Sequence, residues 1–385
     1  MQFIMIDVLR AVAALTVLIY HTIAHMNWTS FPVSGPLLWF RIGWMGVDLF
    51  FVISGLVISL SAFSMLQKSP AYYIEFSAHR LARIAPLYYA TGLFFLVFIT
   101  PEQMFQHDIL PNVFTHLFFI HNMFEAYQGS IDGSNWSLGV EMQFYLFMLL
   151  CAPLLRKTPW WGIAAGCVAI AWAWRFYAFS STSLTGPLGP YTRFWKVTQL
   201  PGDLDEFAVG ICLARVFVSD SGATLLAFGR RHAWLTVIAA SAAMWAALTF
   251  YWRYDAAFWN SHIMVIPYRT ALAAAFGFVV FSACCIQGRI VTLITVPARY
   301  LGTISYGIYL WQLPVILAFT RLSWLTAPRA LPLILGLTIL ISACSYHFFE
   351  KPIIDRVKAY LKQRKFSRAQ PAPARNAEAV SPSTP

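Results

Sequence analysis

Charged residues are scarce in this chain. Asp, Glu, Lys and Arg make up 11% of its 385 residues, whereas 59% are hydrophobic. A soluble globular domain carries about 25% charged residues, and a mean hydropathy of +0.62 is too high for one water-soluble core. The apolar runs are continuous rather than alternating, which disfavours a transmembrane β-barrel. The composition therefore indicates a bundle of membrane helices.

Cysteines are few, and none belongs to a metal-ligand pattern. All six lie within or beside apolar runs: Cys151, Cys167, Cys212, Cys284, Cys285 and Cys344. We interpret them as small packing residues rather than as disulfide partners or zinc ligands, and we expect no bound metal.

Acidic residues are also in short supply, with 16 Asp and Glu against 27 Lys and Arg. Much of the basic excess lies near the C-terminus, where Lys351 to Arg375 contains eight basic residues. Beside membrane helices such a segment favours contact with anionic membrane lipid, and we do not expect nucleic-acid binding. After Arg368 the composition turns to Pro, Ala and Ser, so we expect residues 370–385 to be disordered.

Ten apolar runs are candidates for membrane helices, which need roughly 20 residues each. They lie at 4–24, 44–63, 84–99, 137–155, 160–178, 203–218, 233–251, 269–287, 303–320 and 330–349. The apolar segment 112–124 is interrupted by His116, His121 and Asn122, and we interpret it as an interfacial or re-entrant piece of a long loop. The predicted fold is an all-α polytopic transmembrane bundle, with a membrane domain at 1–352 and a tail at 353–385.

The distribution of Lys and Arg predicts that both termini face the cytoplasm. The C-terminal tail supplies most of the inside charge, and the loop 100–135, expected outside, contains neither Lys nor Arg. The N-terminus lacks a basic n-region and a cleavage site, so we expect the first helix to be retained as a signal anchor. The predicted location is the cytoplasmic membrane of a bacterium.

Ionisable residues inside membrane helices are costly and mark candidate functional sites. The first helix contains Asp7, Arg10 and His21. Arg10 and His21 are eleven residues apart, which places them on one helical face but about 16 Å apart along the axis. We therefore expect Arg10 in the cytoplasmic half of the bundle and His21 near the outer end.

Two carboxylates are expected at the depth of His21. Asp48 opens the second helix and Glu141 opens the fourth, and both helices are predicted to run from outside to inside. A histidine beside a carboxylate can act as a general base, and either Asp48 or Glu141 could be the partner of His21. Each carboxylate could instead be a residue favoured by the helix dipole, and His21 could be a polar contact between helices.

A pair of arginines, Arg80 and Arg83, lies one turn apart at the expected cytoplasmic mouth of the third helix. Such a pair can hold phosphate groups by charge-assisted hydrogen bonds, or it can be an ordinary positive-inside anchor. The acidic run Asp203, Asp205 and Glu206 is interpreted as a solvated helix start.

Six sequence blocks, taken in order, resemble the type 3 membrane acyltransferase family, which O-acylates cell-surface sugars and related acceptors. They are Ile6–Ala14, Gly46–Gly55, Arg80–Tyr88, Trp136–Tyr145, Leu301–Trp311 and Phe349–Pro352. The chain departs from the usual family pattern at Ala11, Gly139, Met142 and Gln312, the last of which stands where a second histidine is frequent.

The resemblance implies transfer of an acyl group, usually acetyl, from acyl-CoA to a carbohydrate or glycolipid hydroxyl. Arg10 and His21 would be essential, with His21 as the base and Asp48 or Glu141 as its support. Arg80 and Arg83, with Arg10, would bind the donor. Acetyl-CoA would be a co-substrate, with no metal required.

Two other functions remain open from the sequence. The polar residues could line the pathway of a transporter or flippase for a glycolipid intermediate, or the basic tail could make the protein a scaffold for partners. The acceptor, the acyl chain and the oligomeric state are not specified by the residues.

Overall fold

The computed structural model describes residues 3–186 and 188–369 of the chain, and in these residues it contains helices and no strands. The first eight α-helices are α1 (Ile4–His25), α2 (Met45–Lys68), α3 (Tyr72–Phe94), α4 (Ile109–Leu117), α5 (Trp136–Leu155), α6 (Trp160–Ser180), α7 (Gly189–Val197) and α8 (Leu200–Phe217). The remainder are α9 (Asp220–Arg231), α10 (Ala233–Tyr254), α11 (Arg269–Cys285), α12 (Arg289–Ile294), α13 (Val296–Thr303), α14 (Ser305–Thr320), α15 (Ala327–Ser345) and α16 (Lys351–Ala369).

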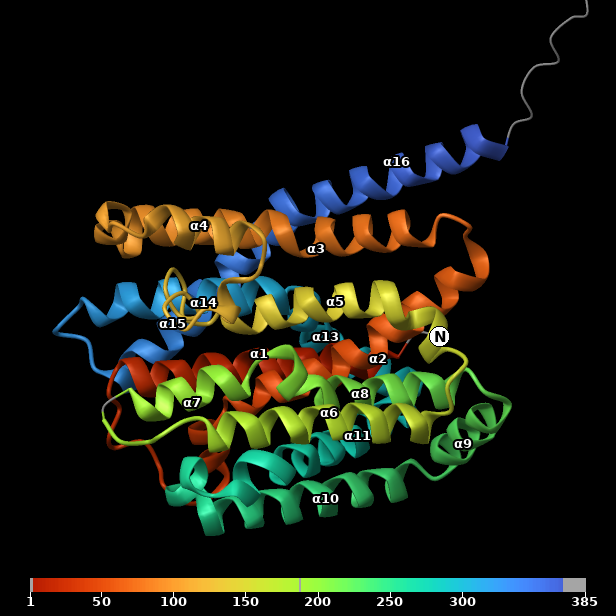
Figure 1. The fold of residues 1–385 in the computed structure, drawn as a ribbon, viewed down its shortest axis with the longest axis horizontal. Helices are drawn as coiled ribbons and strands as arrows, with labels where there is room; N and C mark the ends of the chain where they lie inside the picture. The colour runs from red at the N-terminus through yellow and green to blue at the C-terminus, as the bar shows by residue number, and fades with distance from the viewer. Residues whose placement is uncertain (1–2, 187, 370–385) are drawn as a thin grey trace, which may run out of the picture.

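Within the described residues, eight helices are long and apolar enough to cross a membrane, and two bent pairs raise the number to ten. The bends lie between α8 and α9 (99°) and between α13 and α14 (70°). The predicted all-α polytopic bundle of about ten helices is confirmed. The long helices run side by side (Figure 1), and the start of α1 and the end of α16 lie toward the same end of the bundle.

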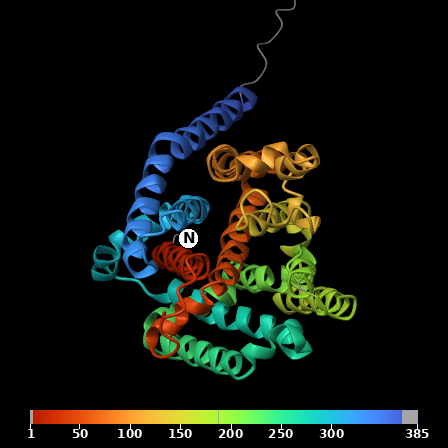
Figure 2. The same ribbon diagram turned by 90° about the vertical axis from the view of Figure 1, so that its left-hand side faces the viewer.

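The outside and the interior of the bundle carry apolar side chains for different reasons. Many large apolar side chains, such as Trp245 and Leu150, are exposed on the outside of the bundle, as expected for helices that contact lipid. The interior is filled instead by a large apolar core around α2, which includes Val52, Leu56 and Phe207. Helix α1 lies inside the ring of helices (Figure 2), where it packs against α2, α11, α13 and α14.

The third membrane helix begins earlier than predicted. It starts at Tyr72 rather than near residue 84, and a π-turn extends it to Ile99. The polar residues of its first turns do not end the helix, because they find partners inside the bundle: the Arg80 guanidinium donates to Ser61 Oγ at 2.9 Å. Arg80 and Arg83 consequently lie within the helix and not at its mouth.

A close contact between α2 and α8 sets the register of the bundle. Gly55 and Gly210 face each other, and a Cβ atom on either would lie 2.2 Å from a backbone oxygen of the other helix. Both helices run in the same direction, with Asp48 and Asp203 each seven residues before the glycine. Seven residues are about two helical turns, so this contact brings the two aspartates to one level.

The loop expected outside folds back onto the bundle. It contains α4 and a short 3-10 turn, His121–Met123, neither of which is a candidate membrane span. The rings of His116 and His121 stack at 4.1 Å, and His121 Nε2 lies 3.1 Å from the Asn135 carbonyl oxygen at the start of α5. Burial lowers the pKa of His116 to about 4 and that of His121 to about 3, so both rings are neutral.

Candidate active site

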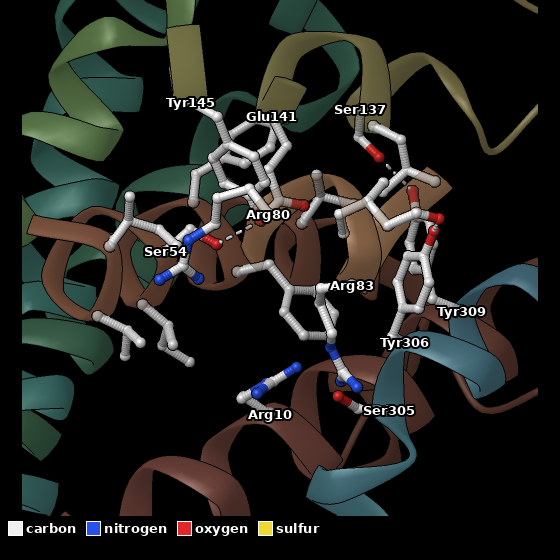
Figure 3. A pocket seen from close by; sticks show the side chains of 18 residues that line it. Arg10, Ser54, Arg80, Arg83, Ser137, Glu141, Tyr145, Ser305, Tyr306 and Tyr309 are labelled. Atoms are coloured by element: carbon white, nitrogen blue, oxygen red, sulfur yellow. Dashed lines mark hydrogen bonds between the residues drawn. The ribbon is translucent and has the colours of Figure 1, made fainter. Parts of the chain in front are cut away.

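A cavity with an empty volume of about 810 Å³ lies in the centre of the bundle. We name it the central cavity. Helices α1, α2, α3, α5 and α14 supply its walls, and Figure 3 shows its polar side chains. They are Arg10, Ser54, Arg80, Arg83, Ser137, Glu141, Tyr145, Ser305, Tyr306 and Tyr309. The cavity is therefore a polar chamber inside a bundle whose outer surface is apolar.

Glu141 is held by hydroxyl groups in this cavity. Its Oε1 atom accepts hydrogen bonds from Ser54 Oγ at 2.9 Å and from the Tyr145 hydroxyl at 2.7 Å. Figure 3 shows the contact with Ser54 as a dashed line. These two hydrogen bonds hold the Glu141 side chain in one orientation at the wall of the cavity.

The three arginines of the cavity are only partly neutralised. Arg83 forms a long ion pair with Glu350, at 3.6 Å, and its guanidinium lies over the Tyr306 ring. Arg80 lies over the Tyr145 ring and has no carboxylate partner among the described residues. The three guanidiniums outnumber the two glutamates near them, which favours a ligand that carries or develops negative charge.

Arg10 has neither an ion pair nor a hydrogen bond within the described part of the chain. In Figure 3 its guanidinium lies near that of Arg83, beside Ser305. Arg10 also lines a second cavity, of about 1740 Å³, at the end of the bundle where α1 begins. We name this the N-terminal cavity; it shares Arg10 and Val57 with the central cavity.

A third cavity, of about 1220 Å³, lies toward the opposite end of the bundle and is lined by His21. We name it the His21 cavity. It shares Val47 and Tyr309 with the central cavity. The Tyr309 hydroxyl lies 2.7 Å from Ser137 Oγ and donates to the Ser134 carbonyl oxygen at 2.8 Å, which fixes the ring between the two chambers. The three cavities thus follow one another along α1.

His21 projects into its cavity without a carboxylate partner. The rings of Tyr20 and His25 are 5.5 and 5.9 Å away, centroid to centroid. The buried Nδ1 atom has no hydrogen bond to any described residue, and the amide of Gln312, whose Oε1 is also unpaired, lies beside the ring. Sequence reasoning did not assign Gln312 a role, although its place in the block after Trp311 singled it out.

The structure separates the two carboxylates that the sequence placed beside His21. Glu141 lines the central cavity with the arginines, whereas Asp48 lines the same cavity as His21. Asp48 is paired with Arg269 at 3.3 Å rather than with His21, and its Oδ2 atom has no hydrogen bond among the described residues. The arginines and His21 thus line neighbouring cavities of one series. Glu141 lies in the central cavity and Asp48 in the His21 cavity.

A buried ion network adjoins the His21 cavity. Arg269 pairs with Asp48, with Asp203 at 3.0 Å and with Glu206 at 2.9 Å. Arg175 pairs with Asp205 at 2.6 Å and with Glu206 at 3.6 Å. The prediction that Asp203, Asp205 and Glu206 form a solvated helix start is therefore wrong, because these side chains are buried between α2, α6 and α11. Sequence reasoning missed the role of Arg175 and Arg269, although each interrupts an apolar run.

A family model described as an acyltransferase domain matches residues 3–347, nearly the whole chain. The chain belongs to this acyltransferase family. The multi-pass membrane bundle described above is thus the structure of an acyltransferase domain, and the resemblance seen in the sequence blocks is confirmed.

Relatives of this chain come from several bacteria. Peptidoglycan O-acetyltransferase OatA of Listeria monocytogenes is 27% identical over 376 residues, covering 90% of this chain and 55% of the relative. Bacillus subtilis YrhL, provisionally named as a peptidoglycan O-acetyltransferase, is 26% identical, covering 94% and 56%. Acyltransferase MdmB of Streptomyces mycarofaciens is 27% identical, covering 54% and 56%. The chain spans about half the length of these relatives. No solved structure matches this chain.

Proposed function

We propose that this protein transfers a short acyl group, with acetyl as the leading candidate, from acyl-CoA to a hydroxyl group of a cell-surface carbohydrate or glycolipid. The observation that carries the proposal is the series of three cavities, with Arg10 between the first two and His21 in the third. Such a series provides an anion-binding entrance and a separate chamber for the acceptor. The names of the relatives, which refer to O-acetyltransferases of peptidoglycan, support the same reaction.

In this proposal the N-terminal cavity opens to the cytoplasm of a bacterium, in its cytoplasmic membrane, and the His21 cavity faces the outer side. The donor enters through the N-terminal cavity. Arg10, Arg80 and Arg83 bind its inner part, and the hydroxyls and Glu141 of the central cavity orient it. The acyl group then lies beside Tyr309, where the donor and acceptor chambers meet.

His21 is the proposed general base. The imidazole takes the proton of the acceptor hydroxyl while the oxygen attacks the thioester carbonyl carbon. The new carbon–oxygen bond forms as the carbon–sulfur bond breaks, and the proton held by His21 is returned to the leaving thiolate. Gln312 is a positioning residue in this scheme, because its unpaired Oε1 atom can accept a hydrogen bond from Nδ1–H of His21. The other ring nitrogen, Nε2, is then left unprotonated and can act as the base.

The test uses the full chain purified in detergent, with radiolabelled acetyl-CoA and short peptidoglycan or polysaccharide fragments as acceptors. The wild type should transfer label to an acceptor, and His21→Ala should lose about 10²–10⁴-fold in rate while still binding coenzyme A. Transport of a glycolipid in sealed vesicles without any acyl turnover would contradict the proposal, and so would full transfer by His21→Ala.

A further inference from the structure

The N-terminal cavity contains two arginines that the scheme above does not use. Arg156 directly follows α5, and Arg215 lies in the last turn of α8; both line this cavity together with Arg10. The lining includes one carboxylate, Asp7. Among the described residues, neither Arg156 nor Arg215 forms an ion pair. The entrance therefore carries an uncompensated positive charge.

Arg215 is held in place for a ligand. Its Nε atom donates to the Thr158 carbonyl oxygen at 3.0 Å, which fixes the plane of the guanidinium. Its two terminal nitrogens have no partner within the described chain. A guanidinium fixed in this way is suited to bind phosphate oxygens by paired, charge-assisted hydrogen bonds.

The cavities differ in size, which indicates which part of a large donor each could hold. The space at the N-terminal cavity, about 1740 Å³ including open solvent at its mouth, exceeds that of the central cavity, about 810 Å³ on the same measure. Arg156 and Arg215 line the N-terminal cavity directly, whereas Arg80 does not. Arg80 donates a hydrogen bond to Ser61, which lines the cavity, so Arg80 lies deeper in the bundle. A bulky, polyanionic group therefore fits the outer chamber, and a slender chain fits the inner one.

We propose that the N-terminal cavity is the subsite for the phosphate groups of the donor's nucleotide, with Arg156 and Arg215 as its anion-binding side chains. This inference rests on the proposed function, and it leaves Arg80 and Arg83, with Arg10, to the inner part of the donor, where negative charge develops on the thioester during transfer. The shared chemistry is recognition of phosphate, which a lipid headgroup at the membrane surface also carries. The arginines could alternatively stabilise the C-terminal ends of α5 and α8.

The experiment measures binding to the full chain in phosphatidylcholine nanodiscs by titration calorimetry. The probes are coenzyme A, adenosine 3′,5′-bisphosphate and S-acetylpantetheine, which lacks the nucleotide. The variants are Arg156→Gln, Arg215→Gln, the double variant and Arg215→Lys. Lys157→Gln is the matched control, because Lys157 is exposed beside Arg156 and does not line the cavity.

Each glutamine variant should weaken binding of coenzyme A by about tenfold and the double variant by about a hundredfold, since a hydrogen bond to a charged group is lost at each position. Adenosine 3′,5′-bisphosphate should follow coenzyme A, S-acetylpantetheine should be unaffected, and Arg215→Lys should retain part of the affinity. Lys157→Gln should bind like the wild type. If the glutamine variants instead melt at a lower temperature and keep the wild-type selectivity between the probes, the arginines only stabilise helix ends, and the inference is overturned.

Two further outcomes separate this inference from the proposed function. If the double variant binds coenzyme A as the wild type does, Arg156 and Arg215 do not form the phosphate subsite, and the proposal that acyl-CoA is the donor is unaffected. If the wild type binds coenzyme A through these arginines but transfers no acyl group, the subsite stands and the proposed function fails. An effect of the substitutions that appears only in phosphatidylglycerol nanodiscs would assign the site to a lipid headgroup, and failure of the wild type to bind coenzyme A would reject both proposals.

Discussion

The bundle contains two groups of buried arginines, and they differ in how their charge is balanced. In the ion network, Arg175 and Arg269 face four carboxylates within 4 Å, namely those of Asp48, Asp203, Asp205 and Glu206. In the central cavity, the three arginines meet mainly hydroxyl groups and aromatic rings, with one ion pair. The first group is saturated by the protein itself, whereas the second retains capacity for an anion.

The difference separates a structural role from a binding role. A buried cation that is paired with carboxylates of the protein holds helices together and has little left for a ligand. A cation that faces an empty chamber costs stability and is tolerated where function requires it. We therefore expect substitutions in the network to act on folding and substitutions in the cavity to act on turnover.

The largest effect should follow Arg269→Ala. The substitution removes the partner of Asp48, Asp203 and Glu206 and leaves buried carboxylates without a counter-charge. Breaking a buried pair in this way costs about 3–5 kcal/mol, so the variant should melt at a much lower temperature or fail to accumulate in the membrane. Fluorescence-detected gel filtration after heating measures this. Arg253→Ala, at an exposed position of α10, is the control, and equal stability of the two variants would contradict the structural role.

Arg10→Gln should give the opposite result. The variant should keep the melting temperature of the wild type within the range of a surface substitution, because Arg10 forms no ion pair in the described chain. Acyl transfer should fall by about 10²-fold, as for loss of a preorganised charge at a reacting group. Parallel melting and rate measurements on one preparation test this. Unfolding of Arg10→Gln with normal specific activity of the folded fraction would reverse the comparison.

The buried histidines predict that the stability of the protein depends on pH. His116 and His121 are buried and neutral, with pKa values of about 4 and about 3, below the value of about 6.5 expected in an unfolded chain. Stability should therefore be lost as the pH falls from about 6.5 toward 4, by about 1.4 kcal/mol per histidine and pH unit. Burial raises the pKa of Asp132 to about 6, so its protonation offsets roughly one histidine below that pH.

Melting curves between pH 7 and pH 5 measure this loss. His116→Phe should reduce the pH dependence, because the stacked ring is kept and the titrating group is removed. His107→Phe, at an exposed position shortly before α4, serves as the control. A melting temperature independent of pH in the wild type would show that these rings are already solvated.

The smallest effect should come from Gln312→Leu. Loss of the amide beside His21 should lower the turnover number by about tenfold, since the imidazole is no longer held in one tautomer, and it should shift the pH profile of the reaction. The Michaelis constant for the donor should be unchanged. Gln312→Asn should restore part of the rate, and an unchanged pH profile in both variants would limit Gln312 to packing.

The sequence was sufficient for the number of membrane helices and for the separation of Arg10 from His21, because both follow from hydrophobic runs and helical geometry. It placed the start of α3 twelve residues too late, since polar residues in that segment were taken as the end of the apolar span. It could not reveal the ion network, in which Asp48 and Arg269 are 221 residues apart. Such pairs depend on which helices become neighbours, and no local pattern specifies that.

The glycine contact between α2 and α8 has a consequence for motion. Because the two backbones touch at Gly55 and Gly210, we expect α2 and α8 to move as one rigid unit, and α2 lines all three cavities. On the facing side α14 meets α3 through side chains, such as the Tyr306 hydroxyl, which donates to the Ile84 carbonyl oxygen at 2.7 Å, and Phe94, whose ring packs against that of Trp311. Side-chain contacts separate more readily than interlocked backbones, so we expect the movement that admits a large donor to occur between α3 and α14.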